Sequence, residues 1–174
     1  MDLSATVDDI LRAARTAGRL EETVATGAFG DLNADTVEAV VAEAARFAGE
    51  VLAPLNAIGD RAGVGFAEGR VTMPAGFLAA YRQWTAAGWS ALGAPADWGG
   101  QAMPVSVQIA VQELWNAANP AFAIGAILTS GAVEALAAHA DGGLQRRFIP
   151  HLVTGKWMAT MNLTEPEAGS AQYL

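Results

Sequence analysis

The sequence WMATMNLTEPEAGS, residues 157–170, joins an alternating segment to a proline turn and a glycine–serine pair. Apolar side chains recur at every second position over residues 157–163, which is the period of a β-strand. The alternation stops at Pro166, because proline has no N–H for a ladder and restricts the residue before it. At Gly169-Ser170, backbone without a Cβ can approach a ligand. The stretch predicts a strand leading into a ligand-facing loop, although on spacing alone an ordinary surface turn is the commoner explanation.

Composition is typical of a folded chain of one domain. It has 174 residues, of which 52% are hydrophobic and 16% charged, so a sizeable core is expected and a disordered chain is excluded. Cysteine is absent, which excludes disulfides and thiolate metal sites. The only two histidines, His139 and His151, argue against a histidine-based metal cluster and are interpreted as ordinary residues at helix ends.

The charge balance is acidic. The formal net charge is −8, and Lys156 is the one lysine. A protein that reads a nucleic-acid backbone needs clustered cations, so this class is excluded. The same shortage means that a phosphorylated ligand has to be held by backbone N–H groups, by hydroxyl groups or by cations of another chain segment.

Neither a basic start nor an apolar region of the secretory type is visible in the first residues. Together with the lack of cysteine, this favours a cytoplasmic location. Residues 121–140 are apolar and about as long as a membrane span, but they include Thr129, Ser130 and Glu134 and have no basic flanks. We therefore expect a helix buried inside an all-α protein, and no integral membrane segment.

Hydrophobic periodicity predicts about six helices, which cover approximately residues 4–17, 35–52, 74–88, 104–115, 120–140 and 144–153. A looser segment is expected after the first helix. The second should begin with a capping box of Asp35 and Glu38 and end at Pro54, because the residue before a proline resists the helical conformation. Glycine-rich residues 59–69 predict a loop with at most a short hairpin of residues 65–67 and 70–72.

After the predicted helices, the strand at residue 157 has no visible partner. An isolated strand leaves its backbone donors and acceptors unpaired, and even a lone hairpin is only marginally stable. We therefore expect the chain to be the opening part of a larger protein, cut where a sheet begins.

Four stretches together resemble one enzyme family. MNLTEPEAGS (161–170) closely resembles the flavin-binding signature of the acyl-CoA dehydrogenases. In the family's order and roughly its spacing, three others resemble its first conserved helix end, its Gly-Gly turn and the segment before the flavin strand: FAGEVLAPLN (47–56), GWSALGAPADWGG (88–100) and RRFIPHLVTGK (146–156). The residues before 34 resemble the extended start of the branch that includes 3-methylthiopropanoyl-CoA dehydrogenase.

The resemblance implies a fold and a domain organisation. Residues 34–155 would form the all-α N-terminal domain of the acyl-CoA dehydrogenase fold, preceded by an extension helix and loop at 1–33. Residues 156–174 would begin the middle β-barrel domain, with one strand and a truncated flavin-binding loop. In the family a C-terminal helical bundle follows, and the full-length protein is expected to be a homodimer or homotetramer.

The resemblance also implies a reaction. An α proton and a β hydride are removed from an acyl-CoA, as in β-oxidation of fatty acids, giving a trans-2-enoyl-CoA and reduced FAD. The electrons then pass to an electron-transferring flavoprotein. The family's catalytic base lies beyond the end of this chain, so no catalytic residue is assigned within it.

By the family pattern, the cofactor-binding residues are Met161, Leu163, Thr164 and Ser170. The Thr164 hydroxyl would donate to flavin N5, Met161 would pack by the flavin, and backbone N–H groups near Leu163 and Thr164 would stabilise charge at N1 and O2. Ser170 would contact the thioester ligand or the cofactor. Glu165 is interpreted as a loop-fixing or solvated acid.

Two further observations concern the substrate pocket and the residue after Ser170. Helices between residues 105 and 136 would line the acyl pocket by resemblance, and Trp98 could border it. The family usually has Asp after the serine, whereas this chain has Ala171. That departure and the missing base keep a second interpretation open: a non-catalytic helical interaction module, or a partner subunit, that retains the fold.

Overall fold

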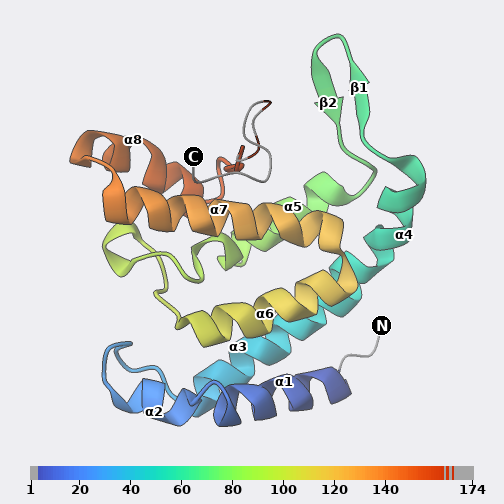
Figure 1. Cartoon of the computed structure of the whole chain (residues 1–174). Coiled ribbons are helices and arrows are strands. Elements are labelled where there is room, and N and C mark those ends of the chain that lie inside the picture. Colours follow the sequence, from blue (N-terminus) through green and yellow to red (C-terminus); the bar gives the residue numbers. More distant parts are fainter. Residues whose placement is uncertain (1–3, 163, 165, 167–174) are drawn as a thin grey trace.

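The computed structural model describes residues 4–162, 164 and 166, and it shows helices packed in layers with one small hairpin (Figure 1). The helices are α1 (Ser4–Thr16), α2 (Leu20–Ala25), α3 (Ala34–Phe47), α4 (Ala53–Ala62), α5 (Phe77–Ala86), α6 (Val105–Ala118), α7 (Pro120–His139) and α8 (Gly142–Val153). A π-helical turn (Ala48–Leu52) joins α3 to α4, and 3-10 turns occupy Trp89–Ala91 and Ala96–Trp98. The predicted all-α fold class is confirmed.

The layers enclose a core built around indole rings. α1 packs against α3 and α6, α6 packs against α7, and α7 packs against α8 (Figure 1). At the centre, Trp115 is 1% exposed, and its ring meets Trp84 and Trp89 edge to face with centroids 5.8 and 5.3 Å away. Such pairs fix ring orientation beyond what area burial alone requires. The aromatic core therefore holds α5 and α6 in a defined relation.

Residues before 34 form part of this core. Ile10 and Leu11 of α1 are buried against the central helices, and Leu20 of α2 is 1% exposed. α2 lies in the segment that we predicted to be loose. The prediction missed it because six residues are too few to show a helical period.

The second predicted helix begins earlier and runs further than expected. Asn33 caps α3 by accepting a hydrogen bond from Thr36 N (2.9 Å), so the expected capping box at Asp35 is wrong. The predicted end at Pro54 is also wrong, because the chain continues through the π-helical turn into α4 and ends at Ala62. The turn admits an extra residue, and Pro54 then falls in the first turn of α4, where a missing N–H costs little.

The short hairpin is confirmed. β1 (Gly65–Ala67) pairs antiparallel with β2 (Arg70–Thr72), with Phe66 opposite Val71. Glu68 and Gly69 form the turn with φ of 51° and 75°, the positive values that a tight hairpin turn requires. Phe66 and Val71 are 74% and 63% exposed, and the hairpin projects from the helical body (Figure 1).

α7 is only partly buried, which corrects the expectation of a helix buried inside the protein. Its inner face carries Ala123, Ala126, Thr129 and Val133, but its apolar outer face is open. By length and composition this helix could cross a membrane, with 22% of its apolar window buried. Its packing against α4, α6 and α8 is also that of a helix in a folded domain.

The strand predicted from residue 157 is not formed, since described residues 158–162 belong to no helix or strand. A strand exists only as part of a hydrogen-bonded ladder, and the one ladder among the described residues is the hairpin. Within the part of the chain that the structure describes, residues 157–162 thus have no strand partner.

Candidate functional site

The segment that the sequence singled out begins where α8 ends, and two side chains hold this junction. Ser90 Oγ donates to Val153 O (2.8 Å), and Tyr81 OH donates to Gly155 O (2.7 Å). Gly155 has φ +68°, and a Cβ there would overlap the Thr85 side chain. The junction therefore requires glycine and is fixed against α5 and the turn after it.

Two more hydrogen bonds direct the chain along α8 and α7. Trp157 N–H donates to His151 O (3.0 Å), and Ala159 N–H donates to Thr129 Oγ1 (3.2 Å). The Trp157 ring also lies against the His151 imidazole, with centroids 4.2 Å apart. Residues 155–159 consequently follow a path set by three helices, α5, α7 and α8.

The predicted cofactor-binding residues lie further along this path. Met161 is 60% exposed, and Thr164 is exposed as well. Leu163, Glu165 and Ser170 lie outside the described residues, so their predicted roles stay predictions. The structure brings Met161 and Thr164 to one solvent-facing stretch that emerges beside α7.

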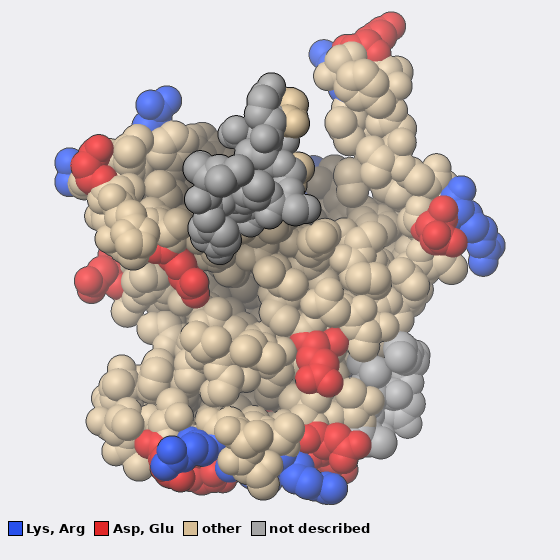
Figure 2. All heavy atoms as spheres, viewed as in Figure 1, with Lys and Arg blue, Asp and Glu red and all other residues tan. Residues whose placement is uncertain are grey.

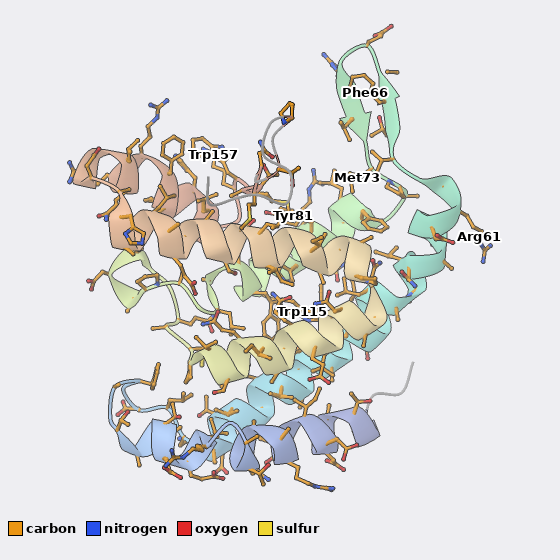
Figure 3. All side chains as sticks on the ribbon, viewed as in Figure 1. Arg61, Phe66, Met73, Tyr81, Trp115 and Trp157 are labelled. Carbon is orange, nitrogen blue, oxygen red and sulfur yellow. The ribbon has the colours of Figure 1, made fainter. Side chains whose placement is uncertain are left out.

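An apolar pocket of about 280 Å³ opens beside the same segment. Figure 3 labels two of its lining residues, Met73 just below the hairpin and Tyr81 on α5. Its walls come from α5 and α7, and Met73 and Met158 complete it; the lining residues are Met73, Phe77, Leu78, Tyr81, Trp84, Ala121, Phe122, Ile124, Gly125, Ala126 and Met158. These lining residues include no charged side chain, so the pocket suits an uncharged apolar group.

The pocket floor is rigid. Tyr81 stacks on Trp84 with ring centroids 5.7 Å apart, and Trp84 meets Phe122 edge to face at 6.3 Å. Trp84 is 5% exposed and rests on the indole core. The floor is therefore shaped by packing that exists before any ligand arrives.

Charges lie around this region rather than in it. Figure 2 shows Lys, Arg, Asp and Glu on the layer of α1 and α2, on α4, at the hairpin tip and toward α8, while the surface over the middle of α7 is uncharged in this view. Burial raises the pKa of the Tyr81 phenol, so its hydroxyl stays a donor to Gly155 O at neutral pH. Within the described part of the chain, no group of three acidic or histidine side chains could hold a metal ion.

Sequence reasoning found the segment but missed the side chains that hold it. Tyr81 lies within a predicted helix, but its hydroxyl bond to a residue 74 positions away has no local signal. Ser90 and Thr129 were missed for the same reason. Of the helices between residues 105 and 136, α7 lines this apolar pocket and α6 does not, and whether the pocket holds an acyl chain stays a prediction. Trp98 packs instead against the cluster around Val133 and Ile149.

Comparison with known proteins gives a consistent result. The family described as "Acyl-CoA dehydrogenase, N-terminal domain" matches residues 34–156. The chain is 37% identical to 3-methylmercaptopropionyl-CoA dehydrogenase of Ruegeria pomeroyi, over 98% of this chain and 29% of that protein. It is 33% identical to a butyryl-CoA dehydrogenase of Syntrophomonas wolfei, over 70% of this chain and 20% of that protein.

A third relative is the broad-specificity linear acyl-CoA dehydrogenase FadE5 of Mycobacterium tuberculosis, 31% identical over 87% of this chain and 25% of that protein. The chain thus spans less than a third of the length of each of these relatives. The first match covers 170 residues, so it includes most of the region before residue 34.

Proposed function

Because the chain belongs to the acyl-CoA dehydrogenase family, we propose that it forms the N-terminal helical part of an FAD-dependent dehydrogenase. The proposed reaction oxidises an acyl-CoA to a trans-2-enoyl-CoA and passes the electrons to an electron-transferring flavoprotein. The match of residues 34–156 to the family's N-terminal domain carries this proposal. On the same ground we propose a homodimer or homotetramer with a cytoplasmic location.

The acyl chain is assigned to the apolar pocket between α5 and α7. Transfer of each CH₂ from water into such surroundings contributes about 0.8 kcal/mol, so an uncharged lining is what an acyl chain requires. The position supports the assignment too, because Met158 lines the pocket and belongs to the segment that leads to Thr164.

The residues that we propose to hold FAD are Met161, Leu163, Thr164 and Ser170, with Ser170 also reaching the thioester. Two observations fit this group: the Met161 side chain offers exposed apolar surface to a flat ring, and Thr164 is an exposed hydroxyl donor on the same stretch. Bound FAD supplies a hydride acceptor at its N5 atom. The part of Thr164 is to donate a hydrogen bond that orients this ring.

The α proton of the substrate needs a base. The lining residues of the pocket include no carboxylate or histidine. We therefore propose that the base is supplied by a part of the enzyme outside this chain, and that the chain contributes binding and orientation.

Two glycines of α7 give a matched test of the pocket assignment. A Cβ at Gly125 would overlap Met158, whereas a Cβ at Gly131 meets open space. Octanoyl-CoA and free CoA are titrated into the chain by calorimetry. We expect octanoyl-CoA to bind at least roughly ten-fold more tightly than CoA, from burial of its methylenes. Gly125→Leu should abolish that difference, while Gly131→Leu keeps it.

Equal affinity for CoA and octanoyl-CoA, or a wild-type response from Gly125→Leu, would contradict the assignment. Flavin binding is measured separately, by mixing the chain with FAD, removing free cofactor and recording the absorbance. Retained flavin supports the proposed cofactor site, whereas a chain that folds, keeps no flavin and binds only a protein partner favours the non-catalytic interaction module.

A further inference from the structure

The apolar pocket has two kinds of wall. α5 and α7 supply walls that the aromatic core holds in place. Met158 supplies a wall from the segment after α8, and this side chain is 50% exposed. A ligand in the pocket would thus touch both the helical body and the segment that leads to Thr164.

Tyr81 joins the same two parts. Its ring lines the pocket and stacks on Trp84, while its hydroxyl donates to Gly155 O at the start of the segment. A phenol is rigid beyond two side-chain torsions, so contact on the ring and the hydrogen bond at its tip cannot change independently. The ring orientation that suits a ligand and the one that holds Gly155 are therefore linked.

The segment itself is held by few contacts beyond this point. Between residues 156 and 162, the hydrogen bonds found are Trp157 N–H to His151 O and Ala159 N–H to Thr129 Oγ1, the latter 3.2 Å long. The Trp157 and Met161 side chains are 41% and 60% exposed. Regions with little burial and exposed hydrogen bonds open locally at low free-energy cost, so one added contact changes their population strongly.

We propose that Tyr81 is a positioning residue that links occupation of the apolar pocket to the placement of residues 155–162. The link rests on the proposed function only for the identity of the ligand. An apolar ligand presses on the Tyr81 ring and on Met158, and both contacts favour the conformation in which Gly155 O is bound. By reciprocity, a segment held in this conformation raises the affinity of the pocket for its ligand.

A purely structural role of Tyr81 would give a different result in a hydrogen-exchange experiment. If Tyr81 only anchored the junction, Tyr81→Phe would loosen the segment equally with and without ligand, and ligand binding would still protect it. If Tyr81 carries the link, the response to ligand is itself strongly reduced, and only the direct contact with Met158 remains. The discriminating quantity is therefore the ligand-induced change in the segment, measured in both proteins.

Hydrogen exchange followed by mass spectrometry reports this change in peptides that cover residues 155–162. Two probes are used: octanoyl-CoA, and the anionic dye 1-anilinonaphthalene-8-sulfonate, whose apolar aromatic rings would enter the pocket and whose fluorescence reports occupancy without requiring an acyl-CoA site. In the wild-type chain we expect either bound probe to slow exchange there at least roughly five-fold. Gly125→Leu, which fills the pocket, should remove the protection.

In Tyr81→Phe, loss of one hydrogen bond should speed exchange of residues 155–162 about 2- to 12-fold without ligand. The protection by either probe should fall to less than roughly two-fold, a remainder that the direct contact with Met158 supplies, while dye fluorescence shows that the pocket is still filled. Thr154→Val is the matched control, because the Thr154 hydroxyl bonds only to carbonyls of its own helix, Pro150 O and His151 O. It should keep the wild-type response.

Undiminished protection in Tyr81→Phe would overturn the proposal, as would a wild-type chain that binds dye without protection of the segment. The two proposals fail separately. If the dye protects the segment through Tyr81 but octanoyl-CoA does not bind, the link stands and the substrate assignment falls. If octanoyl-CoA binds in the pocket but protects both proteins alike, the substrate assignment stands and the link falls.

Discussion

Replacement of Asn119 should destabilise the chain more than any other single polar change considered. The side chain is 0% exposed and lies between α6 and α7. Its Oδ1 caps α7 by accepting from Phe122 N (3.1 Å), and its Nδ2 donates to Leu52 O (3.2 Å), the last carbonyl of the π-helical turn. One residue therefore satisfies a helix start and a buried acceptor 67 positions away.

The magnitude follows from these two partners. Loss of an N-cap costs about 0.5–2 kcal/mol, and loss of one buried hydrogen bond costs about 0.5–1.5 kcal/mol. Asn119→Ala should thus lower the free energy of unfolding by about 1–3.5 kcal/mol. In a urea titration with a slope of about 2 kcal/mol/M, the midpoint should fall by roughly 0.5–2 M.

Two companion variants separate the contributions. Asn119→Ser keeps an oxygen for the cap but loses the donor to Leu52, so it should show about half of the effect. Asn116→Ala removes a donor that bonds only to Gln112 O within α6, and it should change stability by less than about 1 kcal/mol. If Asn119→Ala and Asn116→Ala have equal midpoints, the reasoning that Asn119 joins the two helix junctions is refuted.

Three further outcomes are expected. Gly155→Ala should lower the free energy of unfolding by about 1–3 kcal/mol, because φ is +68° and the new Cβ overlaps Thr85. Gly131→Ala, in open space on α7, should raise the free energy of unfolding by up to about 1 kcal/mol. Urea titration compares the two variants, and equal effects would contradict the geometry. Because burial raises the pKa of Tyr81, the phenol of the unfolded chain loses its proton at lower pH, around its ordinary pKa of 10.0, than the phenol of the folded chain. The stabilisation that Tyr81 contributes is therefore fully present below pH 10 and is lost as the pH rises through the folded pKa. Tyr81→Phe should lack this share of the alkaline loss of stability, and identical alkaline profiles would argue against a buried phenol. Phe66→Ser should reduce self-association in analytical ultracentrifugation, since this ring is 74% exposed. It should change the free energy of unfolding, measured by urea titration, by no more than about 0.5 kcal/mol. A large loss of stability would show that the hairpin packs on the body.

The elements that were predicted correctly are those determined by residues close together in the sequence. The hairpin followed from the glycine-rich stretch, and α6 and α7 were predicted as separate helices over approximately residues 104–115 and 120–140. Pro54 misled the prediction because a π-helical turn changed which helical position it occupies. That turn is set by packing with α6 and by the donor from Asn119, and neither is visible within residues 48–54.

In the candidate site, too, the sequence indicated neighbouring residues but not the contacts between distant ones. The signature at 161–170 drew attention to Met161 and Thr164 through its own residues. The hydroxyls that place the preceding segment come from Tyr81, Ser90 and Thr129, at separations of 74, 63 and 30 residues from their partners. Contacts over such distances depend on how helices stack, so one sequence does not reveal them.

The burial of α1 and α2 shows that the folding unit extends beyond the stretch that matches the family's N-terminal domain. The family match starts at residue 34, yet Ile10, Leu11 and Leu20 close the core over Val37 and Val41, which are 1% and 0% exposed. A gene trimmed to the family border would encode a protein with a bare apolar flank on α3, inclined to precipitate in the expression host.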